Sequence, residues 1–130
     1  MIAIDTNVLV RLLVGDDPAQ KRRAKRLVEK SDVLIPASVL LEAEWVLRSA
    51  YGFEATAISA AFRGFLGLPN VTPESPVILA QALDRYDAGL DFADALHMCS
   101  SHQANAFYTF DRRLIRRAQG LDIAVEAVPE

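Results

Sequence analysis

The sequence predicts an α/β domain with a mostly parallel central sheet. Short apolar segments alternate along the chain with longer segments in which apolar residues recur at helical spacing. Strands that alternate with helices in this way usually pair in parallel. The 130 residues, of which 52% are hydrophobic, are enough for a single domain over residues 1–130. No internal repeat, low-complexity tract or linker divides the chain.

The elements are expected to follow one another in a regular order. The first half alternates short apolar runs with amphipathic segments, and it predicts strands at Ile2–Ile4 and Val33–Ile35 and helices at Asn7–Val14, Pro18–Lys30, Ser38–Tyr51 and Ala55–Leu66. Gly15 is expected to end the first of these helices, and Gly52 is expected to end the helix that Ser38 caps. The second half predicts an extended piece at Val71, helices at Pro76–Asp87, Phe92–Gln103 and Arg112–Gln119, a strand at Ala106–Thr109 and an edge strand at Ile123–Val125.

Two acidic residues lie just past predicted strands. Asp5 interrupts the apolar run Met1–Val10 where the first strand passes into a helix, and Asp111 follows the strand Ala106–Thr109. Functional sites of parallel sheets form beyond the carboxyl ends of the strands. We expect Asp5 to be buried, and a buried carboxylate needs helix amides, a cation or a metal ion to compensate its charge.

Glu42 is a second acidic residue in an unexpected place. It lies beside the predicted buried stripe of its helix, which consists of Val39, Ala43, Val46 and Ala50. Glu44 precedes Arg48 by four residues, a spacing that allows a solvated ion pair. Periodicity therefore favours Glu42 as the functional acid, although Glu44 remains an alternative.

Asp91 and Asp94 lie three residues apart at the start of a predicted helix, so both occupy one face of its first turn. Acidic residues are common at this position, because they cap the helix and complement its dipole. The same ordinary role is open to Asp111, as the cap of the helix after it. Each acid alone thus has a structural explanation as well as a functional one.

Several carboxylates that converge at one edge of a sheet suit a hard divalent cation. Mg²⁺ and Mn²⁺ prefer oxygen ligands, and Mg²⁺ commonly retains several waters. Such sites support phosphodiester hydrolysis, because the metal activates an attacking water and a second ion can stabilise the leaving oxygen. The net charge is −3, but two basic blocks, residues 21–26 and 112–117, are placed to hold the phosphates of a polyanion.

The acidic residues lie in four segments that resemble, in the same order, the motifs of PIN-domain nucleases. The segments are Ile4–Leu9 with Asp5, Leu41–Leu47 with Glu42, Asp91–Leu96 with Asp94 and accessory Asp91, and Thr109–Leu114 with Asp111. The resemblance covers nearly the whole chain, and the compact length is similar to that of the toxins of bacterial VapBC toxin–antitoxin pairs. A second acid beside Glu42, Glu44, departs from the motif.

The resemblance implies a three-layer α/β/α fold and a Mg²⁺- or Mn²⁺-dependent endoribonuclease. Asp5, Glu42, Asp94 and Asp111 would share one pocket and hold the metal, with Asp91 as an accessory. It further implies an RNA substrate, a homodimer and a cognate antitoxin protein. Thr6 and Thr109 would support the ligands through their hydroxyls, and Asn7 would order the loop at Asp5. Arg112, Arg113 and Arg116 are the candidates for RNA binding.

Other classes fit the sequence less well. A receiver domain needs adjacent acids after the first strand and a lysine near the end, but every lysine lies at or before Lys30. A phosphatase with an Asp-x-Asp nucleophile needs a second acid where Asn7 stands. A housekeeping RNA-processing nuclease and a non-catalytic PIN-like binding module remain alternatives. No apolar stretch is long enough for a transmembrane helix, and the single cysteine, Cys99, fits a reducing cytoplasm.

Overall fold

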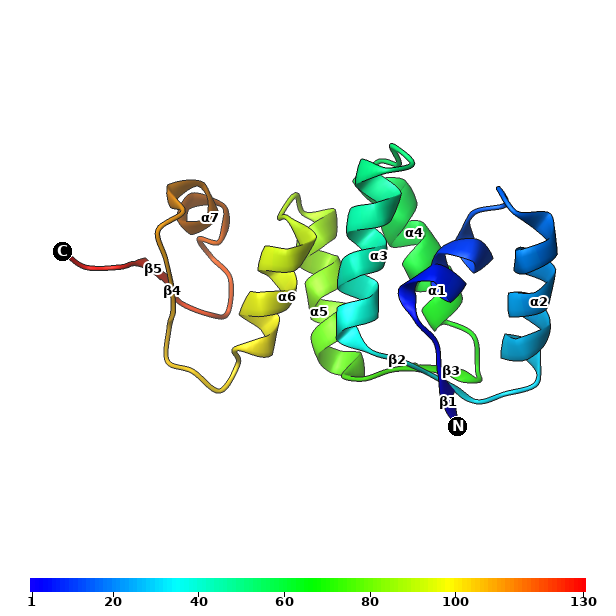
Figure 1. The fold of residues 1–130 in the computed structure, drawn as a ribbon. Coiled ribbons are helices and arrows are strands. Elements are labelled where there is room, and N and C mark those ends of the chain that lie inside the picture. Colours follow the sequence, from blue (N-terminus) through cyan, green and yellow to red (C-terminus); the bar gives the residue numbers. More distant parts are fainter. The chain divides into compact units, whose positions relative to one another are not determined.

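Five short strands and seven helices alternate along the chain in the order that the sequence predicts. The structure is a computed structural model that describes residues 1–130, and Figure 1 labels its elements. The strands are β1 (Ile2–Ala3), β2 (Val33–Ile35), β3 (Val71–Pro73), β4 (Phe107–Thr109) and β5 (Val125–Ala127). The helices are α1 (Thr6–Leu13), α2 (Pro18–Glu29), α3 (Ala37–Ser49), α4 (Ala55–Leu66), α5 (Pro76–Asp87), α6 (Phe92–Ser100) and α7 (Arg112–Arg117).

The chain forms two compact units, Met1–Pro76 and Val77–Glu130, called unit 1 and unit 2 below. Every strand pairing in both units is parallel. The predicted α/β class and the parallel character of its sheets are therefore confirmed. No helix has the length and apolar character that crossing a membrane would require.

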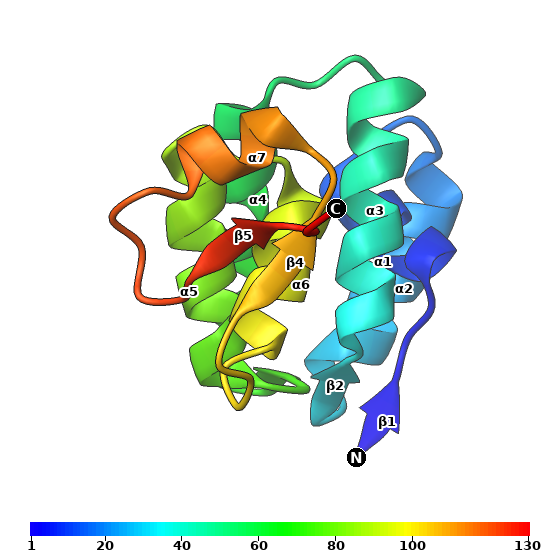
Figure 2. The ribbon, with the colours of Figure 1, turned by 90° about the vertical axis from the view of Figure 1, so that its left-hand side faces the viewer.

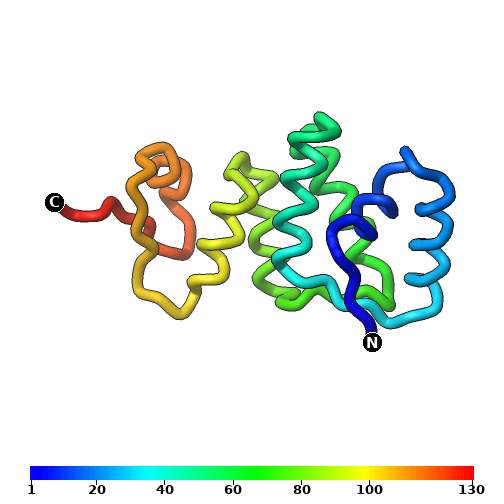
Figure 3. The backbone as a smooth tube through the Cα atoms, viewed as in Figure 1, coloured from blue at the N-terminus to red at the C-terminus, as the bar shows by residue number.

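Unit 1 contains a three-stranded sheet in the order β1-β2-β3. Ile2 lies opposite Val33, and Val33 lies opposite Val71. Two helices carry the chain from each strand to the next, as the backbone trace shows (Figure 3). Because the strands are parallel, Asp5 follows β1 at the same edge at which α3 follows β2.

The start of α3 differs from the prediction. The N-cap is Pro36 rather than Ser38, which lies inside the first helical turn. The first amide of the helix, that of Ala37, instead donates to the Glu74 carboxylate over 2.9 Å. Glu74 directly follows β3, and its own amide donates to the carbonyl of Ile35. A side chain that directly follows a neighbouring strand therefore satisfies the helix end that a local cap was expected to satisfy.

Unit 2 contains α5, α6 and α7 and a two-stranded sheet of β4 and β5, which run side by side in parallel (Figure 2). The register places Phe107 opposite Val125. Phe92 is fully buried and contacts Tyr86 edge-on, with 5.3 Å between the ring centroids. Helix α6 ends at Ser100, three residues before the predicted end, and the hydroxyl of Ser101 donates to the carbonyl of His97.

Candidate active site

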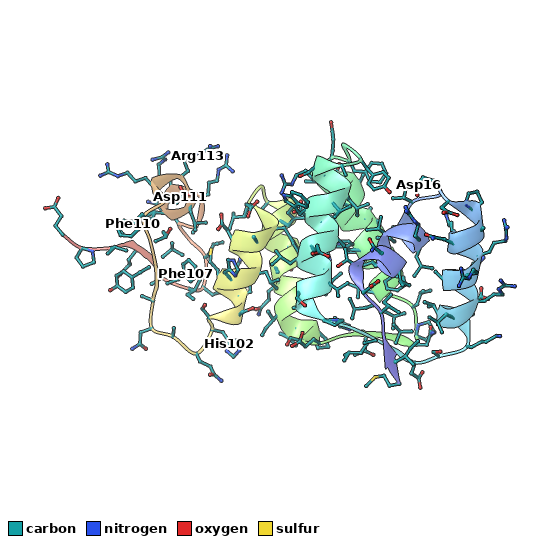
Figure 4. All side chains as sticks on the ribbon, in the orientation of Figure 1. Asp16, His102, Phe107, Phe110, Asp111 and Arg113 are labelled. Atoms are coloured by element: carbon teal, nitrogen blue, oxygen red, sulfur yellow. The ribbon has the colours of Figure 1, made fainter.

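Three aspartates of unit 2 line one cavity of about 240 Å³. They are Asp91 and Asp94 of the α6 start and Asp111 of the α7 start. The side chains of Arg113 and Arg117 share the cavity, with the apolar side chains of Leu90 and Leu114. Figure 4 labels Asp111 and Arg113 at this end of α7. The structure thus brings together three of the five acids that the sequence singles out.

Helix caps position two of these aspartates. Asp91 is the N-cap of α6 and accepts a hydrogen bond from the amide of Asp94 over 3.1 Å. Asp111 is the N-cap of α7 and accepts from the amides of Arg113 and Leu114 over 2.9 and 3.2 Å. Both predicted caps are confirmed. Each cap uses one carboxylate oxygen, so the structural and the functional explanations of these acids are compatible.

The third aspartate, Asp94, experiences the charge of the other two. Partial burial raises the pKa of the Asp94 carboxyl, and the negative charges of Asp91 and Asp111 raise it further, while His97 opposes them. The Asp111 amide donates to the Thr109 hydroxyl over 3.0 Å, so Thr109 orders the turn that presents Asp111. This contact between the Thr109 hydroxyl and the backbone of Asp111 is consistent with the predicted supporting role of Thr109.

Asp5 is exposed, which corrects the expectation of a buried carboxylate. It is the N-cap of α1, and its side chain accepts from the amide of Val8 over 3.1 Å. The charge is thus met by a helix amide and by solvent. Asp5 and Asn7 line a separate cavity of about 490 Å³ within unit 1, with Arg11, Arg23 and Gln20 among its other residues. Thr6, by contrast, is buried, at 8% exposed.

The two glutamates of α3 lie in environments opposite to those that periodicity predicts: Glu44 is buried and Glu42 is exposed. Glu44 is 3% exposed and forms a salt bridge with Arg48, so the pair is real but its carboxylate is buried rather than solvated. Glu42 is exposed. The buried stripe consists of Leu40, Ala43, Glu44 and Leu47, not of Val39, Ala43, Val46 and Ala50. Glu42 remains the candidate functional acid of α3 because its side chain is accessible to solvent and forms no buried ion pair. The sequence favoured it for a different reason, its position beside the predicted buried stripe.

The arginines of α7 divide into two groups. Arg113 lines the acidic cavity, whereas Arg112 and Arg116 are exposed and lie outside its lining. Arg117, which sequence reasoning did not single out, lines the cavity and donates to the carbonyl of Gly89 over 3.1 Å. Its spacing of four residues from Arg113 is the signal that identifies it, since such residues share a helix face.

The donor chemistry of the unit 2 cavity fits a hard divalent cation. Three carboxylates offer only oxygen ligands, and a bound cation would relieve the repulsion that raises the pKa of Asp94. The structure contains no group of three or more His, Cys, Asp or Glu side chains already arranged to hold a metal ion. Binding through the aspartates would therefore require them to draw together, or to act partly through water.

Comparison with protein families agrees with the sequence motifs. The family model described as PIN domain matches residues 2–120, so the chain belongs to the PIN-domain family. A solved structure that resembles it is VapC20 of Mycobacterium tuberculosis, a toxin that cleaves the sarcin–ricin loop. The identity is 23%, the match covers 85% of this chain and 88% of that one, and the TM-score is 0.45. Comparison with curated proteins gave no match.

Proposed function

We propose that this PIN-domain protein is a divalent-metal-dependent endoribonuclease, which hydrolyses phosphodiester bonds within RNA. The observation that carries the proposal is the convergence of Asp91, Asp94 and Asp111 on one cavity that two arginines also line. Carboxylates bind the cation and arginines bind a phosphate, so this cavity offers both functions that metal-assisted phosphodiester hydrolysis needs. Membership in the PIN-domain family supports the same chemistry.

The proposal assigns a role to each acid. Asp94 and Asp111 hold Mg²⁺ or Mn²⁺ in unit 2, with Asp91 as an accessory ligand or a ligand through water. Asp5 and Glu42 of unit 1 complete the acidic set, supported by Thr6 and Asn7. That the four principal acids share a single pocket stays a prediction, which rests on the order of the motifs along the chain.

The reaction divides between the cation and the protein. When bound, the cation supplies Lewis acidity, which activates water for attack on phosphorus and neutralises charge that develops on the phosphate. Arg113 and Arg117 orient the phosphate group through charge-assisted hydrogen bonds. The bond from Arg117 to Gly89 fixes that side chain in advance, which lowers the entropy lost when RNA binds.

Cleavage of RNA tests the proposal directly. Purified protein, freed of any bound partner, is incubated with structured and unstructured RNAs in Mg²⁺, in Mn²⁺ and in excess chelator. We expect cleavage in metal only, and its loss in Asp94→Asn and Asp111→Asn, both of which remove the charge while preserving volume. Asp122→Asn, which changes an aspartate that is 99% exposed in the same unit, serves as the control. Equal cleavage by all four proteins would contradict the proposed site.

We further propose that the enzyme acts in the cytoplasm as the toxin of a type II toxin–antitoxin pair, as a homodimer that a cognate antitoxin inhibits. The order of the four acidic motifs along the chain supports this role. Expression of the chain alone should arrest growth, and co-expression of a short neighbouring reading frame should restore it. Normal growth during expression of active enzyme would favour the housekeeping alternative. Sedimentation of the purified protein reports the dimer.

A further inference from the structure

Two aromatic side chains of unit 2 project into solvent beside the acidic cavity. Phe110 is 84% exposed and Tyr108 is 56% exposed. Burial of an aromatic side chain stabilises the fold, and side chains as exposed as these contribute little of that stability. Their presence on the surface therefore suggests that they bind something. Phe110 directly precedes Asp111, which lines the cavity, and Figure 4 shows Phe110, Asp111 and Arg113 at the junction of β4 and α7.

The two aromatic residues lie on either side of Thr109, the last residue of β4. Tyr108 lies within β4, and Phe110 follows its last residue at a bend of the chain; both are exposed, whereas Thr109 between them is half-buried. This alternation of exposure places the two aromatic side chains on the same side of the segment. Tyr108 is held in place from the neighbouring strand, because it lies opposite Glu126 and hydrogen-bonds to that carboxylate, which raises the pKa of the Tyr108 phenol. Tyr108 and Phe110 thus form an exposed aromatic row immediately before Asp111.

The surroundings of this row are cationic where phosphates would lie. Helix α7 has the sequence Arg-Arg-Leu-Ile-Arg-Arg, and Arg112, Arg113 and Arg116 are exposed. Guanidinium groups bind phosphate oxygens, and aromatic rings stack with unpaired bases. Adjacent sheet aromatics and arginines are how several RNA-binding modules hold single strands without strong sequence preference.

We propose that Tyr108 and Phe110 form a stacking platform for unpaired bases of single-stranded RNA, placed so that the adjoining phosphate enters the acidic cavity. The inference rests on the proposed function and adds to it the side chains that hold the unpaired bases beside the cleaved bond. Bases inside a duplex are already stacked on both faces, so a duplex cannot use this platform. The charge of α7 favours a polyanion over an apolar protein surface as the occupant.

A fluorescence experiment tests whether bases stack at Phe110. The chain has one tryptophan, Trp45, so Trp45→Phe combined with Phe110→Trp leaves a single reporter on the proposed platform. We expect oligouridylate to quench its emission in chelator, where no cleavage occurs, and the same strand annealed to its complement to quench it much less. The matched control is Trp45→Phe with Val77→Trp, at a position of unit 2 that is 70% exposed. Absence of quenching, or equal quenching at both positions, would overturn the platform.

Affinity measurements provide the second readout. Phe110→Ala should weaken binding of the single strand about tenfold, within the range known for loss of one stacked base. Phe110→Tyr should restore it, and Val77→Ala should leave it unchanged. Unchanged affinity in Phe110→Ala would refute the proposal, and so would its conversion from a dimer to a monomer, which would identify the patch as a subunit interface.

The two proposals fail in different ways. Cleavage by the wild-type protein together with unaltered binding in Phe110→Ala would retain the nuclease and reject the platform. Quenching and weakened binding in a protein that cleaves no RNA under any metal condition would retain the platform and reject the nuclease.

Discussion

Glu44 and Arg48 form a two-point ion pair one turn apart on α3. Arg48 donates from Nε to Glu44 Oε2 over 3.0 Å and from Nη2 to Oε1 over 3.4 Å. The Glu44 side chain is 3% exposed, whereas that of Arg48 is 47% exposed. A carboxylate removed from water in this way depends on its partner, because its desolvation is otherwise uncompensated.

Glu44→Gln should destabilise the protein without acting on its chemistry. The substitution removes a buried charge from a paired guanidinium, and since Arg48 is partly solvated we expect a loss of about 1 to 2 kcal/mol in the free energy of unfolding, measured by denaturant titration. Glu42→Gln on the same helix is the control: it should leave stability unchanged and lower RNA cleavage. The opposite pattern would assign the catalytic role to Glu44.

Substitutions at Asp5 should separate its capping role from its charge. Asp5→Ala removes the acceptor for the amide of Val8, so we expect a loss of about 1 kcal/mol in stability. Asp5→Asn retains a side-chain oxygen and should be close to the wild type in thermal unfolding. RNA cleavage should fall in both variants. Activity that follows stability, with Asp5→Asn fully active, would leave Asp5 a structural cap only.

Asp94→Asn should stabilise the metal-free protein at neutral pH. Because folding raises the pKa of Asp94 above its ordinary value of 3.8, its contribution to stability is most favourable below pH 3.8 and declines as the pH rises through the folded pKa. We therefore expect a higher Tm than wild type at pH 7 in chelator, and a difference that vanishes below pH 3.8. Asp122→Asn should show no such gain. Added Mg²⁺ should raise the Tm of the wild type more than that of Asp94→Asn.

Tyr51→Phe should shift the titration of Asp16 in unit 1, which Figure 4 labels. The Tyr51 hydroxyl donates to Asp16 Oδ2 over 2.7 Å, and this bond, followed by the charge of Arg11, lowers the pKa of Asp16 despite some desolvation. Stability from this carboxylate is present above pH 3.8 and is lost as the pH falls through the folded pKa. Carbon-detected NMR should show the Asp16 pKa rising in Tyr51→Phe. Tyr108→Phe, which removes a hydroxyl in unit 2, should leave it unchanged.

Arginines that line the acidic cavity should matter more than those outside it. Arg113→Gln should weaken RNA binding in chelator and reduce the slope of log affinity against log salt by about 1, as expected for one lost phosphate contact. Arg116→Gln, three residues further along α7 and outside the cavity lining, should have a smaller effect. Equal effects would indicate general attraction of a polyanion rather than contact within the cavity.

The parts of the fold that follow from local rules were predictable. Alternating short and long apolar segments predicted the order of all twelve elements. Asp91 and Asp111 were identified as caps because a cap bonds to an amide two or three residues away. Such interactions are contained in a few consecutive residues and hardly depend on the remaining structure.

The errors arose where distant residues decide the outcome. Apolar side chains nearly encircle the first half of α3, so periodicity could not select its buried face. The buried stripe also includes a charged residue, Glu44, and a search for apolar periodicity does not detect such a stripe. The cap of α3 comes from Glu74, 37 residues further along the chain. At the candidate site, the motif order predicted the three aspartates that line the cavity of unit 2, but the place of Arg117 beside them depends on how α7 lies against the loop at Gly89.

Three of the proposed acidic residues, Asp5, Asp91 and Asp111, are also the N-caps of the helices that follow them. A capping oxygen can equally come from asparagine, serine or threonine, none of which carries the charge that a metal site requires. A descendant of this protein could therefore exchange these aspartates for uncharged capping residues and fold as before. The route from a nuclease to an inert RNA-binding relative would then cross no unstable intermediate, and an Asn, Ser or Thr at these positions would mark a sequence that had taken it.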